Sequence, residues 1–238
     1  LIELQKKELK QHRVKWLKNL NKLKNKPTIF LGNEFLDALP IKQFKMINEN
    51  VFERYVNLEK SRIKFVFKKA AKKEINKLKI YKLLKDQGVI EYPEYGFKEL
   101  SIICEKIKKL NGGALFIDYG YKDKKNVSTL QSVMRHKFNN INKNIGNADI
   151  TSLVNFGLYK SYFNNKKLFV EKIVSQSEFL QKMGIIERVK IAESRMNDYD
   201  RSNLQMRIER LIHPHMMGES FKVIFAKNKK CKFSLAFK

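Results

Sequence analysis

Two carboxylates, Glu34 and Asp37, follow directly after the apolar run at residues 28–31, in a chain that is rich in lysine almost everywhere. A third carboxylate, Asp118, follows a second apolar run at residues 114–117. If both runs are neighbouring parallel strands, their acidic carboxyl ends face one crevice, which is where open α/β sheets bind ligands. The three acids are therefore candidates for binding a substrate.

A structural role for the first pair is open as well. Asn33 could cap a helix that begins at Glu34, and Asp37 would then lie near the positive end of that helix. Residue types and spacing favour neither role over the other.

The elements around these acids alternate between helix and strand. Apolar residues recur at helical spacing over residues 1–24, before the strand at 28–31, and over residues 96–110, before the strand at 114–117. Asn111 and the two glycines after it are typical of a left-handed helix end. This alternation of helices and strands predicts an α/β fold with a mostly parallel, Rossmann-like sheet and helices on both faces.

The remaining segments complete one domain over residues 1–238. We expect an insertion at 45–90, made of a β-hairpin and a helix, after the first strand. Further expected elements are a helix or turn at 34–44, a helix opened by residues 149–151, a helix at 176–183, and a strand at 221–226 that pairs with 233–237 as a terminal hairpin.

The formal net charge of +26 first suggests a nucleic-acid partner. The excess is mostly lysine and spreads along the whole chain, so we favour a solvated basic surface and regard nucleic acid as an unlikely partner. No apolar run approaches the ~20 residues of a membrane span, which predicts a soluble protein. Cys104 and Cys231 have no zinc spacing, and His213 and His215 lack a nearby third ligand, so we expect no metal site.

Six segments, in order, resemble the signatures of one family of class I S-adenosylmethionine-dependent methyltransferases. That family includes the mitochondrial complex I assembly arginine methyltransferase and its bacterial relatives. The segments are GNEFLDALPIKQF (32–44), GGALFIDYGY (112–121), STLQSVMRHKF (128–138), ADITSLVNF (148–156, with asparagine in place of the usual aspartate at 155), SQSEFLQKMGIIER (175–188) and MMGESFKVI (216–224).

The resemblance implies a cofactor, S-adenosyl-L-methionine, and a reaction, N-methylation of an arginine in a protein of the respiratory complex I type. A guanidinium is always protonated, and paired carboxylates can bind it bidentately and draw its charge away from the attacking nitrogen. We therefore assign catalytic roles to Glu34 and Asp37. The protein would work in the cytoplasm of a bacterium or in the mitochondrial matrix of a eukaryote.

The other site residues are assigned on the same basis. His136 is a third catalytic candidate, as a polar wall or proton acceptor, and its alternative is a structural histidine bonded to a loop carbonyl. The remaining candidates are Gly32 and Asn33 for the cofactor, and Asp118, Tyr119 and Tyr121 for the substrate.

One part of the family pattern does not occur in this sequence. Family members carry a glycine-rich turn, G-P-G-x-G-x-L, and an acid at the end of the next strand, which bind the cofactor. Here the opening LIELQKKEL resembles the helix that follows that acid, so the chain corresponds to the back two-thirds of such an enzyme. The alternatives are a non-catalytic assembly or binding protein with the same fold and, less favoured, an RNA methyltransferase.

Overall fold

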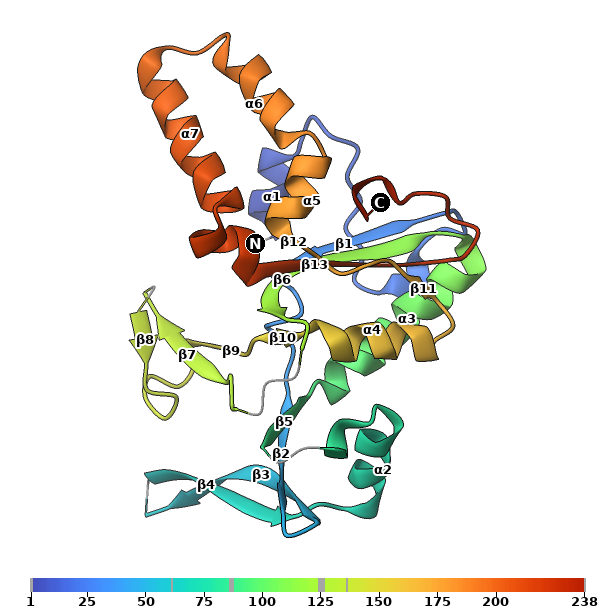
Figure 1. Cartoon of the computed structure of the whole chain (residues 1–238), viewed down its shortest axis with the longest axis vertical. Helices are drawn as coiled ribbons and strands as arrows, with labels where there is room; N and C mark the ends of the chain where they lie inside the picture. Colours follow the sequence, from blue (N-terminus) through green and yellow to red (C-terminus); the bar gives the residue numbers. More distant parts are fainter. Residues whose placement is uncertain (1, 61, 86–87, 124–126, 136, 238) are drawn as a thin grey trace.

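The computed structural model describes residues 2–60, 62–85, 88–123, 127–135 and 137–237. Its central sheet has the strand order β1-β6-β13-β11, with β10 beside β6 and β12 beside β13 (Figure 1). The bounds of these strands are β1 Ile29–Asn33, β6 Gly113–Tyr121, β10 Val154–Asn155, β11 Phe169–Val170, β12 Val174–Ser175 and β13 Phe221–Lys227.

Strands β1 and β6 are parallel neighbours, as the sequence predicts. Their register runs from Ile29 opposite Gly113 to Asn33 opposite Ile117, so the two carboxyl ends lie side by side. Strand β13 pairs with the other edge of β6 in the antiparallel sense. On its own outer edge β1 has no strand partner among the described residues, and Ile29 and Leu31 there are 55% and 70% exposed.

Helices cover both faces of this sheet. Helices α3 (Glu94–Leu110) and α4 (Phe156–Asn165) pack on one face, where Phe116 of β6 stacks on Phe163 of α4. Helix α5 (Gln176–Lys182) packs on the other face, on Val223 and Phe225 of β13. Successive residues of β6 therefore serve two different cores, which explains its nearly unbroken apolar sequence.

The α3–β6 connection confirms the expected turn chemistry. Asn111 ends α3 in the left-handed region, with φ of 58°, and its N–H donates to the Ile107 carbonyl. Gly112 then passes so close to Thr28 that a Cβ would lie 1.9 Å from the Thr28 carbonyl oxygen. Only glycine fits at this crossing into β6.

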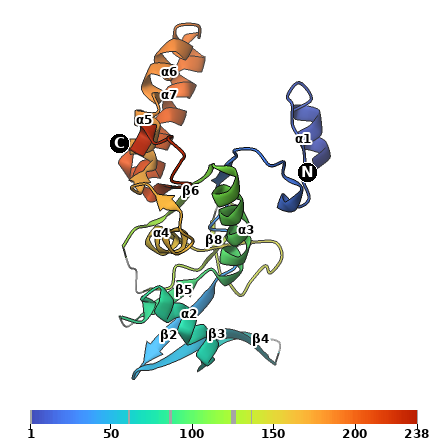
Figure 2. The same ribbon diagram turned by 90° about the vertical axis from the view of Figure 1, so that its right-hand side faces the viewer.

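The prediction of one helix over residues 1–24 is wrong. Helix α1 covers only Ile2–Glu8 and buries no residue, and a short 3₁₀ turn follows at Leu20–Lys22. Figure 2 shows α1 apart from the sheet and its covering helices. A lysine-rich helix with nothing to pack on gains too little to extend, because short isolated helices are marginal in water.

Residues 34–41 form a turn, which is one of the two predicted conformations, and residues 42–44 belong to strand β2 (Lys42–Ile47). Two other predicted elements differ: residues 149–151 form strand β9 (Asp149–Thr151), and the last residues form a 3₁₀ turn at Leu235–Phe237 instead of a hairpin strand. Strand β9 belongs to a small sheet of order β8-β7-β9, with β7 at Gln131–Met134 and β8 at Lys137–Asn139. Tertiary pairing overrides local pattern in such short segments.

The predicted hairpin and helix at 45–90 are part of a larger unit. Its four-stranded sheet has the order β4-β3-β2-β5. Strands β3 and β4 form a hairpin, and β2 and β5 extend the sheet beyond it. The elements are β2 Lys42–Ile47, β3 Asn50–Glu59, β4 Arg62–Lys69, α2 Lys72–Ile80, a 3₁₀ turn at Leu83–Lys85 and β5 Val89–Tyr92.

Two helices form an arm on the far side of the central sheet from this unit (Figure 1). They are α6 (Ile185–Glu193) and α7 (Asp198–Ile212), followed by a helical turn at Pro214–Gly218. Neither α6 nor α7 contains a buried residue. Within the described ranges, no helix has the length and apolar character to cross a bilayer.

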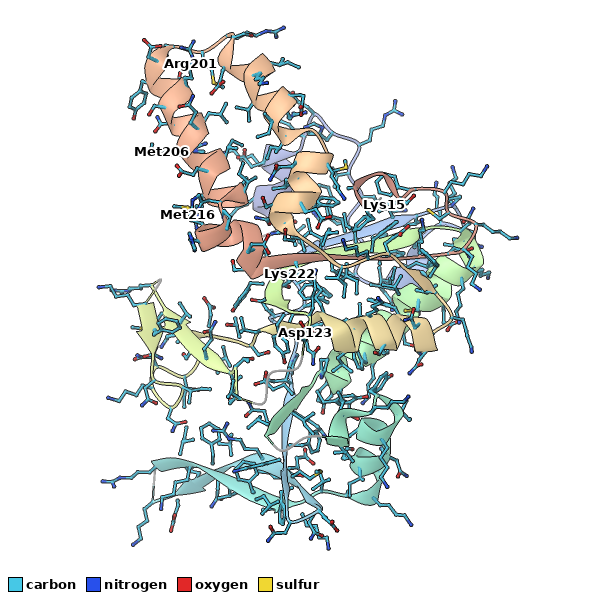
Figure 3. All side chains as sticks on the ribbon, in the orientation of Figure 1. Lys15, Asp123, Arg201, Met206, Met216 and Lys222 are labelled. Atoms are coloured by element: carbon cyan, nitrogen blue, oxygen red, sulfur yellow. The ribbon has the colours of Figure 1, made fainter. Side chains whose placement is uncertain are left out.

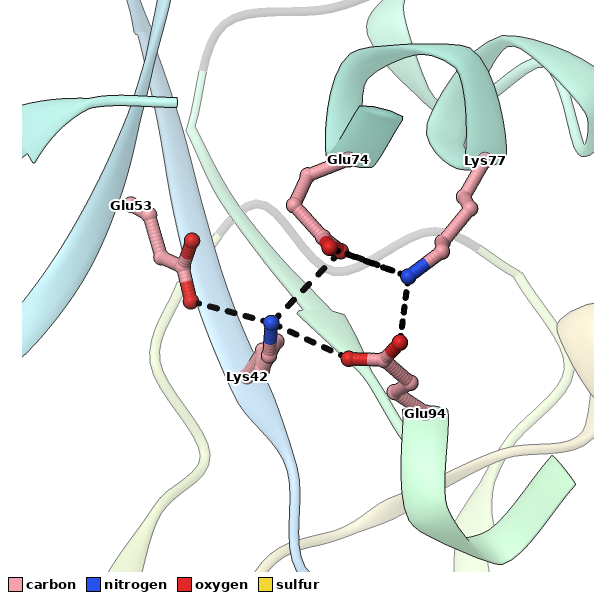
Figure 4. Close-up of polar contacts among 5 residues, drawn as sticks. All are labelled: Lys42, Glu53, Glu74, Lys77 and Glu94. Atoms are coloured by element: carbon pink, nitrogen blue, oxygen red, sulfur yellow. Dashed lines mark hydrogen bonds and ion pairs between the residues drawn. The ribbon is translucent and has the colours of Figure 1, made fainter. Parts of the chain in front are cut away.

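A cluster of five charged side chains joins the four-stranded sheet to α3 (Figure 4). The Lys42 ammonium lies 3.0 Å from Glu94, 3.4 Å from Glu53 and 3.6 Å from Glu74. The Lys77 ammonium lies 2.9 Å from Glu74 and also pairs with Glu94. All five groups are largely shielded from water, so their Coulomb attraction is screened less than at a surface.

We expect this cluster to make stability depend on acid pH. The bond from Lys77, and then Lys42, holds the pKa of Glu94 at about 2, below its ordinary 4.5, against the effect of burial. Because the carboxylate has a lower pKa in the folded state than in the unfolded state, it stabilises the fold at pH values above about 4.5. This stabilisation is lost as the pH falls from about 4.5 towards 2. Glu94→Gln should therefore lower the free energy of unfolding at pH 7 by about 1–3 kcal/mol, and by much less near pH 2.5.

Urea denaturation at the two pH values measures both differences. Glu105→Gln is the matched control, because its pair with Lys108 is exposed and contributes little. A loss for Glu94→Gln that is the same at both pH values would contradict this assignment.

Candidate functional site

The turn after β1 passes over the carboxyl end of β6. Glu34 opens it with φ of 47°, and the Glu34 N–H donates to the Ile117 carbonyl at 3.0 Å. No helix begins at Glu34, so the alternative in which Asn33 caps such a helix is wrong. The Asn33 amide instead donates to the Glu34 carboxylate at 3.4 Å.

The Asp118 carboxylate holds this turn in place by hydrogen bonds to its backbone. Its Oδ2 accepts the N–H groups of Leu36 at 2.8 Å and Asp37 at 3.2 Å, and its Oδ1 accepts the N–H of Tyr119 at 2.9 Å. The carboxyl group is fully buried. Asp118 therefore positions the turn, and its burial does not support the predicted direct contact with substrate.

The carboxylates at this edge influence each other. Burial raises the pKa of Asp118 to about 6, and neighbouring Asp37 acts in the same direction, while the three N–H donors oppose both. Burial also raises the pKa of Asp37, with a smaller contribution from Glu34. A cation placed beside Asp37 would relieve this repulsion, so the site favours a positively charged ligand.

A pocket of about 330 Å³ opens beside Asp37. Its wall includes Pro40, Leu130, Ile150 and Thr151. The pocket thus combines one carboxylate with apolar side chains, which suits a ligand that carries both a charge and an alkyl stem.

Tyr119 supports one wall of this pocket. Its hydroxyl lies 2.7 Å from the Thr151 hydroxyl and accepts a hydrogen bond from Gln131 at 2.9 Å. Tyr121, the other tyrosine that we predicted at the site, lies next to Asn155, and burial raises its pKa to about 12. Tyr121 does not line the pocket beside Asp37.

The sequence predictions missed one buried acid near this pocket, Glu91 of β5. Its carboxylate accepts hydrogen bonds from the Gln43 amide at 2.8 Å and from the Thr129 N–H at 2.9 Å and hydroxyl at 2.5 Å. Gln43 in turn accepts from Arg54 at 2.7 Å. Glu91 lies just before a proline and a helix in the sequence. That local pattern does not indicate a network whose hydrogen bonds join residues up to 48 apart.

The remaining predicted site residues are less informative. A Cβ at Gly32 would lie 2.7 Å from the Phe116 ring and 3.2 Å from Cβ of Phe35, so packing alone requires this glycine. Asn33 ends β1 and is exposed beside Glu34. His136 lies outside the described residues. Across the described ranges, no three His, Cys, Asp or Glu side chains form a group that could hold a metal ion.

The chain is similar in sequence to known methyltransferases. Residues 1–174 match the model of a family described as "Putative S-adenosyl-L-methionine-dependent methyltransferase". The chain is 31% identical over 179 residues to the mitochondrial protein arginine methyltransferase NDUFAF7 homolog of Caenorhabditis elegans, which covers 74% of the chain and 42% of that relative. It is 26% identical over 218 residues to human NDUFAF7, covering 87% of the chain and 47% of the relative.

Two crystal structures from Burkholderia thailandensis share the fold. One, of an uncharacterised protein, has a TM-score of 0.81 at 23% identity and covers 99% of this chain and 65% of its own. The other, bound to S-adenosyl-homocysteine, has a TM-score of 0.76 at 24% identity and covers 94% and 58%. They confirm the predicted α/β sheet with helices on both faces.

The matches cover most of this chain but a smaller share of its relatives. The chain spans less than half the length of the curated relatives given above. The family model nevertheless covers the segment that holds β1, β6, the turn with Asp37 and the pocket beside it. The chain belongs to this family of S-adenosyl-L-methionine-dependent methyltransferases.

Proposed function

We propose that this chain is the acceptor-binding part of a protein arginine methyltransferase, whose substrate is a subunit of the respiratory complex I type. The observation that carries the proposal is the half-open pocket in which Asp37 is held by the buried Asp118. The names of the relatives support arginine as the methylated residue. Their mitochondrial designation supports the matrix as the compartment if the source is a eukaryote, and the cytoplasm is the corresponding place in a bacterium.

In this proposal the chain's own residues bind and orient the acceptor. The arginine stem lies along Leu130 and Ile150, and the guanidinium meets Asp37 at the pocket wall. Glu34, which is exposed on the same turn, completes the pair and localises positive charge away from the attacking nitrogen. S-adenosylmethionine, when bound, supplies an activated methyl group on its sulfonium.

The residues described fit one wall of a cofactor site. Asn33 and Glu34 are polar and accessible at the end of β1, where ligands of α/β sheets bind. The glycine-rich turn that would let the cofactor approach the backbone is not part of this sequence. We therefore expect the 238-residue chain to bind S-adenosylmethionine weakly or not at all.

Titration calorimetry with S-adenosylmethionine tests this expectation on the 238-residue chain and on a form extended upstream to include a glycine-rich cofactor turn. We expect heat of binding only for the extended form. Tight binding by the shorter chain would show that the cofactor site lies elsewhere.

A non-catalytic assembly protein is the second candidate. Such a protein would use the pocket beside Asp37 to bind a partner and would need no S-adenosylmethionine. Transfer of a radiolabelled methyl group to arginine peptides separates the two, because the assembly protein would bind a partner without labelling it.

A further inference from the structure

We propose that the outer face of α7 is a dimer interface, on which a second copy of this chain packs its own α7 in the antiparallel direction. The proposal does not depend on the proposed catalytic function. Its basis is the composition, exposure and charge order of the arm formed by residues 185–212.

The arm differs in composition from the rest of the chain. It contains five of the nine arginines but only one lysine, and five of the seven methionines lie between residues 183 and 217. Protein–protein interfaces are enriched in arginine, methionine and tyrosine and depleted in lysine. In a chain that uses lysine nearly everywhere else, this shift marks the arm as a surface that contacts protein.

Helix α7 has an inner apolar face and an opposite outer face that carries two large, exposed side chains. Ile208 and Ile212 line a groove of about 460 Å³ shared with α5 and α6, so this inner face is turned towards the molecule's own helices. Tyr199 and Met206 are two turns apart and share the outer face, where they are 77% and 58% exposed. Figure 3 shows Met206 on α7 and Met216 on the turn that follows it.

The charge of the arm indicates that the partner on this face is a second copy of the chain. Residues 185–212 carry six basic and five acidic side chains, so almost all of the net charge of +26 lies elsewhere. Two such basic molecules repel each other over most of their surface. They can approach through the one helical arm that is close to neutral.

The order of charges along α7 selects the antiparallel direction. Asp198 and Asp200 lie in the first turn, whereas Arg207 and Arg210 lie in the last two turns. Among the described residues neither of these two arginines has an ion-pair partner, and Asp198 pairs only with its neighbour Arg201. Antiparallel pairing brings the acidic end of each helix to the basic end of the other and also aligns the two helix dipoles favourably.

Met206 lies near the middle of α7, so a two-fold axis between antiparallel helices places the two Met206 side chains close together. This gives a specific test by sedimentation equilibrium in ~0.15 M salt. We expect the chain to exceed its monomer mass of 28.2 kDa and approach twice that value as concentration rises. Met206→Glu and Met206→Lys should each raise the dissociation constant at least about tenfold, because like charges then meet at the axis.

An equimolar mixture of the two variants should regain the dimer, since glutamate then meets lysine. Ile80→Glu, at an equally exposed apolar position on α2, is the matched control and should leave the dimer unchanged. Unchanged circular dichroism would show that the variants are folded. A monomeric mass at every concentration, two variants that dimerise normally, or a mixture that stays monomeric would each overturn the proposal.

Discussion

Asp37→Asn in a form of the protein that carries the glycine-rich cofactor turn is expected to slow methyl transfer to an arginine peptide by about 10²–10³-fold, because the amide removes the charge that orients the guanidinium. Stability should stay the same or rise. Burial and, after it, the charge of Asp37 raise the pKa of Asp118, and the neutral amide removes that charge. Lower activity combined with an unchanged or higher melting temperature distinguishes a substrate-binding role from a structural one.

Glu34→Gln provides the second half of this test. Glu34 is exposed, so its replacement should not change the melting temperature measurably, but it should weaken activity because the acceptor loses one of two carboxylates. Asp149→Asn on β9 is the matched control, an exposed acid near the same pocket that lines no wall of it. If Asp37→Asn and Glu34→Gln both melt early yet methylate at the normal rate once folded, the acids are structural.

Asp118→Ala is expected to cause the largest loss of stability of the changes considered, about 3–5 kcal/mol. Three N–H groups lose their acceptor, and an unsatisfied buried donor costs about 1–3 kcal/mol. Asp118→Asn should cost somewhat less, since its side-chain oxygen can still accept while its NH₂ group faces at least one donor. Urea denaturation followed by circular dichroism measures both.

The activity of these variants is a second measurement. If Asp118 positions the turn, the surviving folded enzyme should bind its peptide more weakly, and an Asp118→Asn variant should retain more function than Asp118→Ala. A loss of less than about 1 kcal/mol in either variant would contradict the positioning role.

The central strands could be predicted because their signals are local. Apolar runs bounded by turn residues defined β1 and β6, and the left-handed Asn111 followed from the chemistry of helix ends. The order helix, strand, acid then predicted that the two strands are parallel neighbours, and their register confirms it.

The conformation of the candidate site could not be predicted in the same way. Phe35, Leu36 and Leu39 have a spacing that suits a helix, yet the Leu36 and Asp37 amides bond to Asp118, which lies more than 80 residues further along the chain. Local periodicity contains no information about such a partner. The same limit explains why Glu91 went unnoticed, because its partners come from β2 and from the segment before β7.

The open edge of β1 has a consequence for how the isolated chain behaves in solution. Its unpaired backbone groups and exposed Ile29 and Leu31 offer a template for strand addition, without the charged or proline residues that usually protect such edges. Electrostatic repulsion from a net charge of +26 then opposes aggregation. Because added salt screens that repulsion over distances beyond about 3 Å at 1 M, concentrated salt should turn a clear solution of the chain turbid.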